Sequence, residues 1–558
     1  MVCSAHPSAE ALIDQADAAL DAARKFAADV RRRLLGQVGG AGDGVAVDPA
    51  RLDRHQHDAH GYAWIETTIA ALDALIGWAA AAHDRGDLRE VDALVLRLAF
   101  GDYLGQLAGG IAIGPNEYFR PGQIGLDAAA RSLADHPAVA GLIARADAES
   151  RAALVALVRA GAGVSETSGD EALDEIRAQF RRFTAERITP FAHRWHLDDA
   201  LIPDALITEL GALGTFGICV DPAYGGLGLG KLEMCVVTEE LSRGWIGAGS
   251  LGTRSEIAAE LIALAGTDAQ KTHWLPGLAS GAILPTAVFT EPGAGSDLAS
   301  LATRATQAPD GSWRISGAKT WITHAARTDL MTLLARTGGE GHRGLSMFLI
   351  AKPRGTETEP FPVVGLSGGE IAVLGYRGMR EYELSFDEFE APAESLLGDV
   401  EGEGFRQLMR TFEGARIQTA ARAVGVAWRA YELGLGYAMV RHQFGRPLID
   451  FPRVADKLVT MLVETVAARE LAYAAARTKD AGGRSDVEAG MAKLLAARVA
   501  WTNADASLQI HGGTGYALET EISRILCDAR ILSIFEGAAE IQAHIIARGL
   551  LQRGTEEQ

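Results

Sequence analysis

The sequence predicts an α+β fold that is mainly α-helical, with one β domain between helical regions. Amphipathic helical patterns fill the chain before Leu284 and again after Gly404. Between Leu284 and Leu397 the apolar residues recur with a period of two, which is typical of strands. At 558 residues the chain is also too long for a single core, so three or four structural units are expected.

Helices are predicted throughout the first 160 residues, where we find no catalytic motif. Their patterns cover Ala11–Arg33, Tyr62–His83, Leu88–Leu107 and Leu133–Ala160. Glu66-Thr67 and the helical hairpin after it resemble Glu464-Thr465 and the helices that follow. Two Ala-rich hairpins resemble each other easily, so both chance and duplication remain open.

The later elements follow in the order helices, strands, helices. Helices are predicted at Glu171–Ile188, Pro203–Leu213, Leu232–Ser242 and Ser255–Ala265. Strands are predicted at Leu301–Gln307, Trp313–Lys319, Asp329–Ala335, Gly344–Ala351 and Tyr382–Phe386. Long helices follow at Phe405–His442, Val454–Thr478, Asp486–Gln509 and Gly537–Leu551. These patterns divide the chain into a helical extension (1–165), a helical domain (166–283), a β domain (284–398) and a C-terminal helical domain (399–558).

The composition excludes several classes of partner and site. A net charge of −19 argues against nucleic acid or an anionic membrane surface as the main partner. The four cysteines form no CxxC pair, so we expect no metal site, no disulfide framework and a reducing, cytoplasmic setting: Cys3, Cys219, Cys235 and Cys527. The N-terminus lacks the basic region of a signal peptide. Asp73 interrupts the best apolar run, Ile69–Ala82, so no membrane span is expected.

Four short motifs occur in a fixed order after residue 284. The first, at 289–297, reads Phe-Thr-Glu-Pro-Gly-Ala-Gly-Ser-Asp, and the second, at 319–323, reads Lys-Thr-Trp-Ile-Thr. The third, at 441–447, reads Arg-His-Gln-Phe-Gly-Arg-Pro. The fourth combines Gln-Ile-His-Gly-Gly at 509–513 with Phe-Glu-Gly at 535–537. Each motif alone is weak, because a Gly-rich turn or a buried Trp is usually structural.

Glu536 in the fourth motif has the setting of a catalytic base. Its neighbours Ile534, Phe535 and Gly537 are apolar or small, so its carboxylate is expected in a poorly hydrated place. Burial raises the pKa of an acid, and a more basic carboxylate suits abstraction of a weakly acidic C–H proton near neutral pH. The simpler interpretation is an acid at a helix N-terminus, since a helical pattern follows. The other three motifs favour the catalytic interpretation.

Together, in this order and across a helix–β–helix chain, the motifs resemble the acyl-CoA dehydrogenase family over residues 170–558. The resemblance implies a helical domain, a small β-barrel domain and a C-terminal four-helix bundle, here with an extra N-terminal helical extension. It implies FAD as the cofactor and oxidation of an acyl-CoA to its 2,3-enoyl-CoA. Glu536 matches the base, which takes the α proton while hydride leaves Cβ for flavin N5.

The resemblance also implies roles for other residues. Four match contacts to the flavin ring, with the last near N5: Phe289, Thr290, Trp321 and Thr323. Seven match the rest of the FAD site: Arg441, Phe444, Gln509, Gly512, Gly513, Ala538 and Glu540. Of these, Arg441 and Phe444 reach the FAD of the neighbouring subunit in the family. Four match contacts to the acyl-CoA: Ser296, Glu413, Arg416 and Gly537.

The chain departs from the family pattern at a few positions. Ala538 stands where the family often has Thr, Phe535 where it often has Tyr, and Cys527 where Arg is frequent. Some relatives carry the base just before the CoA-binding arginine, but that position is Ala415 here. These departures affect local cofactor contacts rather than the chemistry.

The long extension before the Gly225–Gly230 turn makes the chain most similar to family members that oxidise (2S)-methylsuccinyl-CoA to mesaconyl-CoA. A dicarboxylic acyl group needs a cation or several donors in the pocket, because a buried carboxylate cannot stay unpaired. Arg254 falls in the helical segment that floors the acyl pocket in relatives, and Arg377 and Arg380 are second candidates. The alternative for each is a surface arginine paired with an acid such as Glu256 or Glu381.

Other functional classes remain open. Another short-chain or branched acyl-CoA dehydrogenase, or an acyl-CoA oxidase, would use the same residues. A non-catalytic, nucleic-acid-binding relative is expected to have a basic C-terminal region, which this acidic chain lacks. The resemblance implies an electron-transferring flavoprotein as electron acceptor. If residues 60–130 are a degenerate copy of the 464–515 helices, they cover the chain's own C-terminal layer, and a homodimer rather than a tetramer is expected.

Overall fold

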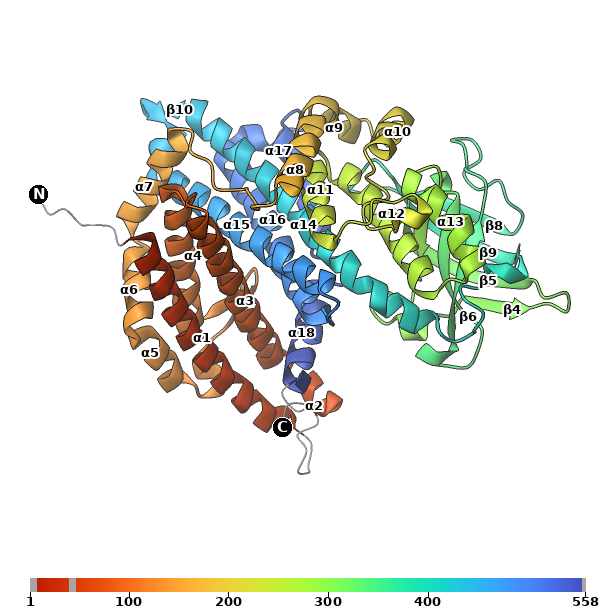
Figure 1. The fold of residues 1–558 in the computed structure, drawn as a ribbon, viewed down its shortest axis with the longest axis horizontal. Coiled ribbons are helices and arrows are strands. Elements are labelled where there is room, and N and C mark those ends of the chain that lie inside the picture. The colour runs from red at the N-terminus through yellow and green to blue at the C-terminus, as the bar shows by residue number, and fades with distance from the viewer. Residues whose placement is uncertain (1–7, 40–46, 554–558) are drawn as a thin grey trace, which may run out of the picture. The chain divides into compact units, whose positions relative to one another are not determined.

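The computed structural model describes residues 8–39 and 47–553, so Cys3 lies outside the described residues. The chain forms two compact units (Figure 1). The first unit comprises Met1–Asp174, Ala427–Thr478 and Gly482–Gln558, and the second comprises Glu175–Val426 and Lys479–Ala481. Each unit therefore contains segments that are far apart in the sequence.

The N-terminal part of the first unit is helical, as predicted. Its helices are α1 (Ala9–Val38), α2 (Pro49–Arg54), α3 (Gln56–Asp84), α4 (Glu90–Gly109), α5 (Asp127–Asp135), α6 (Pro137–Arg145) and α7 (Ala148–Arg159). The single helical stretch predicted over 133–160 was wrong, because Pro137 starts a new helix and the Asp147 side chain caps α7 through the Ser150 N–H. A short hairpin of β1 (Ile111–Gly114) and β2 (Glu117–Phe119) was not predicted.

The C-terminal part of the first unit contains the end of α14 (Gly404–Val440) and four further helices. These are α15 (Pro452–Asp480), α16 (Asp486–His511), α17 (Glu521–Ile531) and α18 (Ala539–Arg553). The short strands β10 (His442–Gln443) and β11 (Arg446–Pro447) form a hairpin after α14. Helix α17 was not predicted, because its apolar pattern is short and interrupted by charged residues.

The N-terminal helices pack on the C-terminal helices within the first unit, with α3 against α18 and α16 (Figure 1). The guanidinium of Arg31 on α1 donates to the carbonyl oxygens of Leu550 and Leu551 at the end of α18. The guanidinium of Arg498 on α16 lies 4.2 Å from the ring centroid of Trp64 on α3. The prediction that the extension covers the chain's own C-terminal helices is thereby confirmed.

The two Glu-Thr pairs noted in the sequence have similar surroundings in the first unit. Thr67 on α3 and Thr465 on α15 each donate their hydroxyl to the carbonyl four residues earlier. Burial raises the pKa of both Glu66 and Glu464. The similarity between the two sequence segments therefore extends to the local environment of their Glu-Thr pairs, and it is compatible with both chance and duplication.

Helix α3 is long and apolar enough to cross a membrane by length and composition, and 56% of its most apolar window is buried inside the structure. A buried core helix passes the same test. Asp73 interrupts the apolar run within α3, and a match by length and composition alone does not contradict the expectation of no membrane span.

In the second unit, helices come before and after the seven strands of one sheet in the order of the sequence. The helices are α8 (Glu171–Phe183), α9 (Thr189–Leu197), α10 (Asp204–Ala212), α11 (Lys231–Gly244), α12 (Ile246–Ala265), α13 (Asp268–Ser280) and the start of α14. The strands are β3 (Pro285–Val288), β4 (Arg304–Gln307), β5 (Trp313–Thr323), β6 (Leu330–Arg336), β7 (Leu345–Ala351), β8 (Leu366–Ile371) and β9 (Glu381–Ala391). Strands β3 and β8 were not predicted.

The sheet has an apolar core on each face. Strand β6 shows the division: Leu330 and Leu334 join a cluster with residues of α12 and α13, whereas Met331 and Leu333 join a cluster made within the β domain. Alternate residues of a strand point to opposite faces, so a strand covered on both faces is apolar throughout. This covering explains why Asp329–Ala335 has few polar residues.

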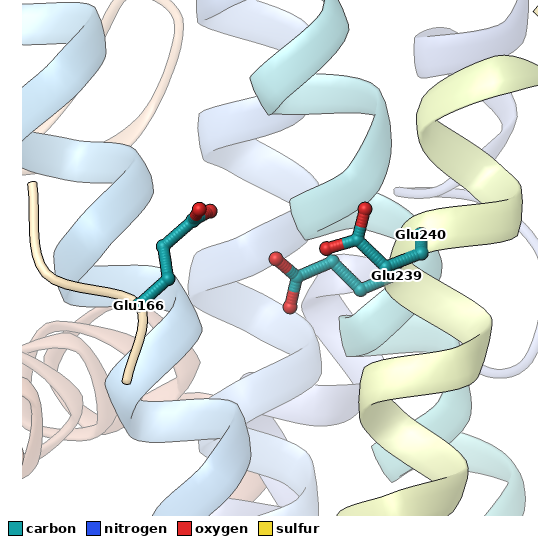
Figure 2. Close-up of side chains that lie close together, drawn as sticks. All are labelled: Glu166, Glu239 and Glu240. Atoms are coloured by element: carbon teal, nitrogen blue, oxygen red, sulfur yellow. The ribbon is translucent and has the colours of Figure 1, made fainter. Parts of the chain in front are cut away.

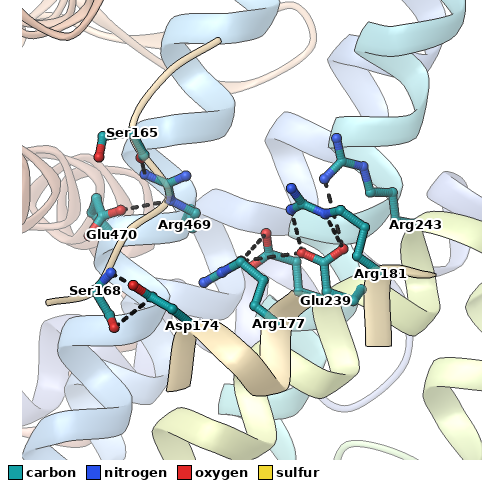
Figure 3. Close-up of polar contacts among 10 residues, drawn as sticks. Ser165, Ser168, Asp174, Arg177, Arg181, Glu239, Arg243, Arg469 and Glu470 are labelled. Atoms are coloured by element: carbon teal, nitrogen blue, oxygen red, sulfur yellow. Dashed lines mark hydrogen bonds and ion pairs between the residues drawn. The ribbon is translucent and has the colours of Figure 1, made fainter. Parts of the chain in front are cut away.

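Helix α8 is held to α11 by buried charges. Glu239 and Glu240 are consecutive on α11 and fully buried (Figure 2). Arg181 donates to Glu240 at 2.6 Å, and Arg177 lies 3.3 Å from Glu240 and 3.6 Å from Glu239 (Figure 3). Arg243 adds a third guanidinium, 3.9 Å from Glu240. Buried acids persist only when paired in this way, so these arginines fix α8 on the unit.

Candidate active site

In the second unit, the segment Phe289-Thr290 lies beside strand β5. The Thr320 N–H donates to the Thr290 carbonyl at 3.0 Å. The Lys319 ammonium donates to the Phe289 carbonyl at 2.9 Å and to the Leu334 carbonyl at 2.8 Å. The first and second sequence motifs are therefore brought together, as the proposed flavin site requires.

A buried ion pair fixes this arrangement. Lys319 is 2.9 Å from Glu291, whose carboxylate also accepts from the backbone N–H groups of Ala302 and Thr303. Burial alone would raise the pKa of Glu291, but the Lys319 ammonium and these backbone donors bring it below its ordinary value. Removal of either charge would leave the other buried and unpaired, so the pair anchors the turn that follows Phe289-Thr290.

Trp321 presents an aromatic face at the end of β5. The pairing of β5 with β9 is irregular between Lys319 and Ile322, and Trp321 has a φ of 58°. Its side chain is 57% exposed, whereas both neighbours on the strand are buried. An exposed indole next to the threonine hydroxyls of this segment fits a planar, hydrogen-bonding ring system.

Thr323 lies two residues further along β5 and is buried. Its hydroxyl is 2.8 Å and 3.0 Å from the two carboxylate oxygens of Glu381 on β9. Its carbonyl accepts from the Thr286 hydroxyl. The side chain predicted near the flavin N5 is thus held by a buried acid of the neighbouring strand.

His324 follows Thr323 in a left-handed conformation, with a φ of 68°. Neither ring nitrogen has a hydrogen-bond partner among the described residues. Burial, together with the charges of Arg327, Arg354 and Arg254, lowers the pKa of His324 to about 3. The imidazole is therefore neutral in the folded protein.

We expect His324 to make the protein sensitive to acid. Its folded pKa lies below the ordinary value of 6.5, so the unfolded chain takes up the proton first and stability is lost as pH falls below about 6.5. At pH 5 this linkage amounts to about 2 kcal/mol. The His324→Asn variant should lose about that much less stability between pH 8 and pH 5 in denaturant unfolding. The exposed His342→Asn variant serves as control, and an equal acid loss in the wild type and His324→Asn would contradict the assignment.

Two guanidiniums and two hydroxyls meet near the start of α12 in the second unit. Arg254 and Arg422 both donate to the phenolic oxygen of Tyr376, at 3.2 Å and 3.4 Å. Arg422, which is fully buried, also donates to the Ser250 hydroxyl at 2.7 Å and, through its other terminal nitrogen, to the Thr419 hydroxyl at 2.7 Å. We call Arg254, Arg422, Tyr376 and Ser250 the arginine cluster.

The two other arginine candidates are engaged in local structure. Arg377 donates to the carbonyls of Val373 and His196, at 3.1 Å and 2.9 Å. Arg380 forms an ion pair with Glu370 at 3.2 Å. Of the acids considered as surface partners, Glu256 pairs with Lys231, and Glu381 accepts from Thr323.

Three of the four residues expected to contact the acyl-CoA lie in the second unit, whereas Gly537 belongs to the first. Ser296 is exposed in the turn after β3. Glu413 on α14 forms an ion pair of 2.8 Å with Lys479. The guanidinium of Arg416, one helical turn later, lies 6.0 Å from the ring centroid of Phe412. The two α14 residues therefore share one face of the helix.

Glu536 lies in the first unit, on the turn between α17 and α18. Its φ is 53° and that of Gly537 is 92°, so two consecutive residues are left-handed. A Cβ on Gly537 would displace the Gln542 amide, whose nitrogen would lie 1.9 Å away, and the φ of Gly537 is one that other residues rarely adopt. Gln542 donates to the Glu536 carbonyl at 3.3 Å, and the Lys493 ammonium donates to the Gly537 carbonyl at 2.6 Å.

The Glu536 side chain is half-buried, not fully buried as its apolar neighbours suggested. Ile534 is itself 51% exposed, because the turn lies at the surface of the unit. The buried Lys493 and Gln542 fix the backbone of the turn instead. A rigid backbone directs a carboxylate as well as close packing does.

The other residues expected at the dinucleotide lie in exposed parts of the first unit. Arg441 and Phe444 belong to the β10–β11 hairpin, where Phe444 is 93% exposed with a φ of 50°. Gln509, Gly512 and Gly513 are exposed at the end of α16. An added Cβ would meet nothing within 4 Å at either glycine, so open space lies beside this backbone. Ala538 and Glu540 flank the first residue of α18.

Sequence reasoning missed several residues of the site. Arg422 carries a detectable signal, because it is a single charge in the apolar run from Ile417 to Trp428. Glu381 carries no distinct signal, because its strand contains four further acids: Glu383, Asp387, Glu388 and Glu390. Lys493 and Tyr376 lie outside the motifs, and only the fold brings them to the site. Gln542 follows shortly after Phe-Glu-Gly, but its role in the turn is visible only in the structure.

Comparison with known proteins places the chain in a family. Three family models match: acyl-CoA dehydrogenase N-terminal domain over residues 170–282, middle domain over 286–389 and C-terminal domain over 402–551. The chain is 57% identical over 513 residues to (2S)-methylsuccinyl-CoA dehydrogenase of Cereibacter sphaeroides, an alignment that covers 90% of this chain and 92% of the relative. That alignment is long enough to include much of the N-terminal extension.

Two solved structures resemble the chain over about 70% of its length. One, titled as the electron transferring flavoprotein of Acidaminococcus fermentans, gives a TM-score of 0.65 at 31% identity and covers 70% of this chain and 100% of its own. A glutaryl-CoA dehydrogenase of Mycobacterium smegmatis in complex with FADH2 gives a TM-score of 0.63 at 28% identity, covering 68% of this chain and 95% of its own. The chain therefore belongs to the acyl-CoA dehydrogenase family, as an oxidoreductase that uses a flavin to dehydrogenate an acyl-CoA thioester.

Proposed function

We propose that the chain is an FAD-dependent enzyme that oxidises (2S)-methylsuccinyl-CoA to mesaconyl-CoA. The observation that carries the substrate assignment is the arginine cluster, in which Arg254 and Arg422 both donate to Tyr376. The 57% identity to a relative of that name supports it, because the similarity continues into the extension. A plain aliphatic acyl group offers no charge with which two guanidiniums could pair.

The cluster suits a carboxylate for electrostatic reasons. The Arg254 and Arg422 guanidiniums both reach the Tyr376 hydroxyl, and a carboxylate bound beside them would be attracted by both positive charges. Guanidinium groups bind carboxylates through paired N–H donors, and the Tyr376 and Ser250 hydroxyls add further donors. A site built in this way rejects a substrate that lacks the carboxylate, because its buried donors are then left unpaired.

The flavin proposal assigns roles to residues of each unit taken by itself. In the second unit, Phe289, Thr290, Trp321 and Thr323 would hold the isoalloxazine ring. In the first unit, Arg441 would bind the pyrophosphate of a neighbouring subunit's FAD through its guanidinium fork. The open backbone at Gly512 and Gly513 allows close approach of a dinucleotide. When bound, the flavin supplies the acceptor for the hydride that leaves Cβ. The match of sequence motifs supports FAD as the particular flavin.

Glu536 would take the α proton of the thioester. The α C–H bond is weakly acidic, so negative charge that develops on the thioester oxygen must be stabilised by donors aimed at it. In the proposed arrangement the backbone N–H of Glu536 is one such donor. Loss of a proton from Cα and a hydride from Cβ leaves a Cα=Cβ double bond, which is the 2,3-enoyl product.

We propose a homodimer as the working form. Among the described residues of the first unit, the four most exposed large apolar side chains lie near two connections, the hairpin after α14 and the segment before α17: Val440, Phe444, Tyr516 and Leu518. Such a patch marks a surface that a partner covers. Light scattering should give twice the 59.0 kDa of one chain, and a tetramer would contradict this proposal.

One screen tests the substrate and separates the alternatives. CoA thioesters are added to the purified protein without oxygen, and bleaching of the flavin absorbance is followed. Methylsuccinyl-CoA should bleach the flavin faster than butyryl-CoA by a wide margin, and the reverse order would reject the substrate assignment. Rapid peroxide formation on admission of air would favour an oxidase over electron transfer to an electron-transferring flavoprotein, the acceptor that we propose.

A further inference from the structure

Strand pairing in the second unit places Glu381 directly opposite Thr323. The two residues are partners in the antiparallel pairing of β5 with β9. Directly opposed side chains in such a ladder have Cβ atoms about 4.5–5.5 Å apart, close enough for contact. Both side chains are buried, each about 6% exposed, and the Thr323 hydroxyl reaches both carboxylate oxygens.

This contact fixes the direction of the Thr323 hydroxyl. A hydroxyl has one proton to donate and two lone pairs, whereas an ionised carboxylate only accepts. The proton of Thr323 therefore points at Glu381, and only lone pairs remain for any other group. Rotation of the hydroxyl would give up a charge-assisted hydrogen bond, which contributes more than a neutral one.

The backbone around the hydroxyl is also fixed. The Thr323 carbonyl accepts from Thr286 at 2.5 Å, and the His324 N–H donates to the Arg380 carbonyl at 2.9 Å. These bonds hold the end of β5 to strand β3 on one side and to the start of β9 on the other. Thr323 thus cannot turn as a whole to offer its proton elsewhere.

We propose that Glu381 is a positioning residue that holds the Thr323 hydroxyl as a hydrogen-bond acceptor toward the flavin ring and thereby favours the reduced ring. The inference rests on the proposed function, which puts the ring N5 next to Thr323. In oxidised flavin N5 is an acceptor, and in reduced flavin it carries a hydrogen and donates. A Thr323 hydroxyl oxygen that is held as an acceptor can therefore form a hydrogen bond with N5 only when the ring is reduced.

The charge of Glu381 acts in the opposite direction. A carboxylate near the ring disfavours the extra negative charge of the reduced flavin. A single substitution would mix the two effects, so the test must separate direction from charge. Glu381→Gln removes the charge but keeps a carbonyl that accepts the Thr323 proton, whereas Glu381→Met removes both.

The experiment measures the flavin midpoint potential of the holoenzyme by reductive titration with reference dyes. We expect the Glu381→Met variant to favour the reduced flavin about tenfold less than Glu381→Gln, which is about 30 mV for a two-electron couple. The same pair of substitutions in the Thr323→Val background should differ by much less, because the hydroxyl is gone. An equal difference in both backgrounds would overturn the proposal.

If the Glu381→Met variant loses its flavin, a second comparison tests the proposal. Thr323→Ser keeps a hydroxyl and Thr323→Val removes it, so the potential of Thr323→Val should be lower by a similar tenfold factor. Equal potentials would also overturn the proposal. A wild-type protein that holds no flavin, or whose flavin no acyl-CoA reduces, would instead reject the proposed function. If methylsuccinyl-CoA bleaches the flavin but all the variants have the same midpoint potential, only the role of Glu381 is rejected, and the proposed function stands.

Discussion

Replacement of Glu536 by glutamine should lower turnover by about 10³- to 10⁴-fold while the flavin stays bound. General acid–base catalysis by a positioned side chain contributes up to about this factor, and glutamine cannot take a proton. The side chains are nearly the same size, and the turn is held through its backbone by Gln542 and Lys493. The fold of the turn should therefore survive the change.

The measurement is rapid-mixing reduction of the flavin absorbance by acyl-CoA, together with exchange of the substrate α proton for solvent deuterium. Both should be lost in Glu536→Gln. Glu519→Gln, an exposed acid on the connection between α16 and α17, should behave as the wild type. Near-normal reduction by Glu536→Gln would assign the base to another residue. Loss of the flavin would show that the side chain is needed for binding.

Replacement of Arg254 by methionine should reduce the preference for methylsuccinyl-CoA over butyryl-CoA by about 10²- to 10³-fold. Truncation of one partner of a buried, hydrogen-bonded charge pair costs about 2–5 kcal/mol, and each 1.4 kcal/mol is tenfold. Arg254 is half-buried, so its loss should harm folding less than loss of the fully buried Arg422. The kcat/KM for methylsuccinyl-CoA should fall, whereas the kcat/KM for butyryl-CoA should stay nearly the same.

The ratio of kcat/KM values for the two thioesters measures this preference. The exposed Arg304→Met variant in the same unit serves as control. Tyr376→Phe should lower the ratio by about five- to tenfold, because it removes one neutral hydrogen bond of about 1 kcal/mol. If Arg254→Met keeps the full preference, the substrate carboxylate is bound by other groups.

The fold class followed from the sequence because its signals are long and periodic. The period of two between Leu284 and Leu397 identified the β domain, and most of the long helices agree with their predicted ranges to within a few residues. Most of the elements missed were short: β3, β8, α2, α9, α17 and the β1–β2 hairpin. The longer helix α13 was also missed, and it contains Pro276. A four-residue strand gives too few repeats for its period to be recognised.

The site could be predicted only where residues of one motif are adjacent in sequence. Lys-Thr-Trp-Ile-Thr predicted a group that the structure keeps together on β5. The arginine cluster instead draws on three segments more than 45 positions apart from one another, and Arg254 alone was chosen from sequence. Pairs such as Thr323 and Glu381 depend on strand register, which a sequence without homologues does not define.

Backbone strain in this chain is concentrated at the residues that carry its proposed function. Among the described residues, eight that are not glycine have a positive φ. Six of them belong to or adjoin the proposed site: Trp321, His324, Tyr376, Arg380, Phe444 and Glu536. The left-handed conformation costs an ordinary side chain about 1–2 kcal/mol, a cost that glycine avoids.

That distribution has a consequence for engineering. A library selected only for heat resistance should accumulate glycine or asparagine at these six positions, because each such exchange relieves strain. The same exchanges remove the base, the indole and the phenol, so the most heat-resistant clones should be the least active. Thermostabilisation of this enzyme is better directed at the helices of the extension, with the six positions held constant.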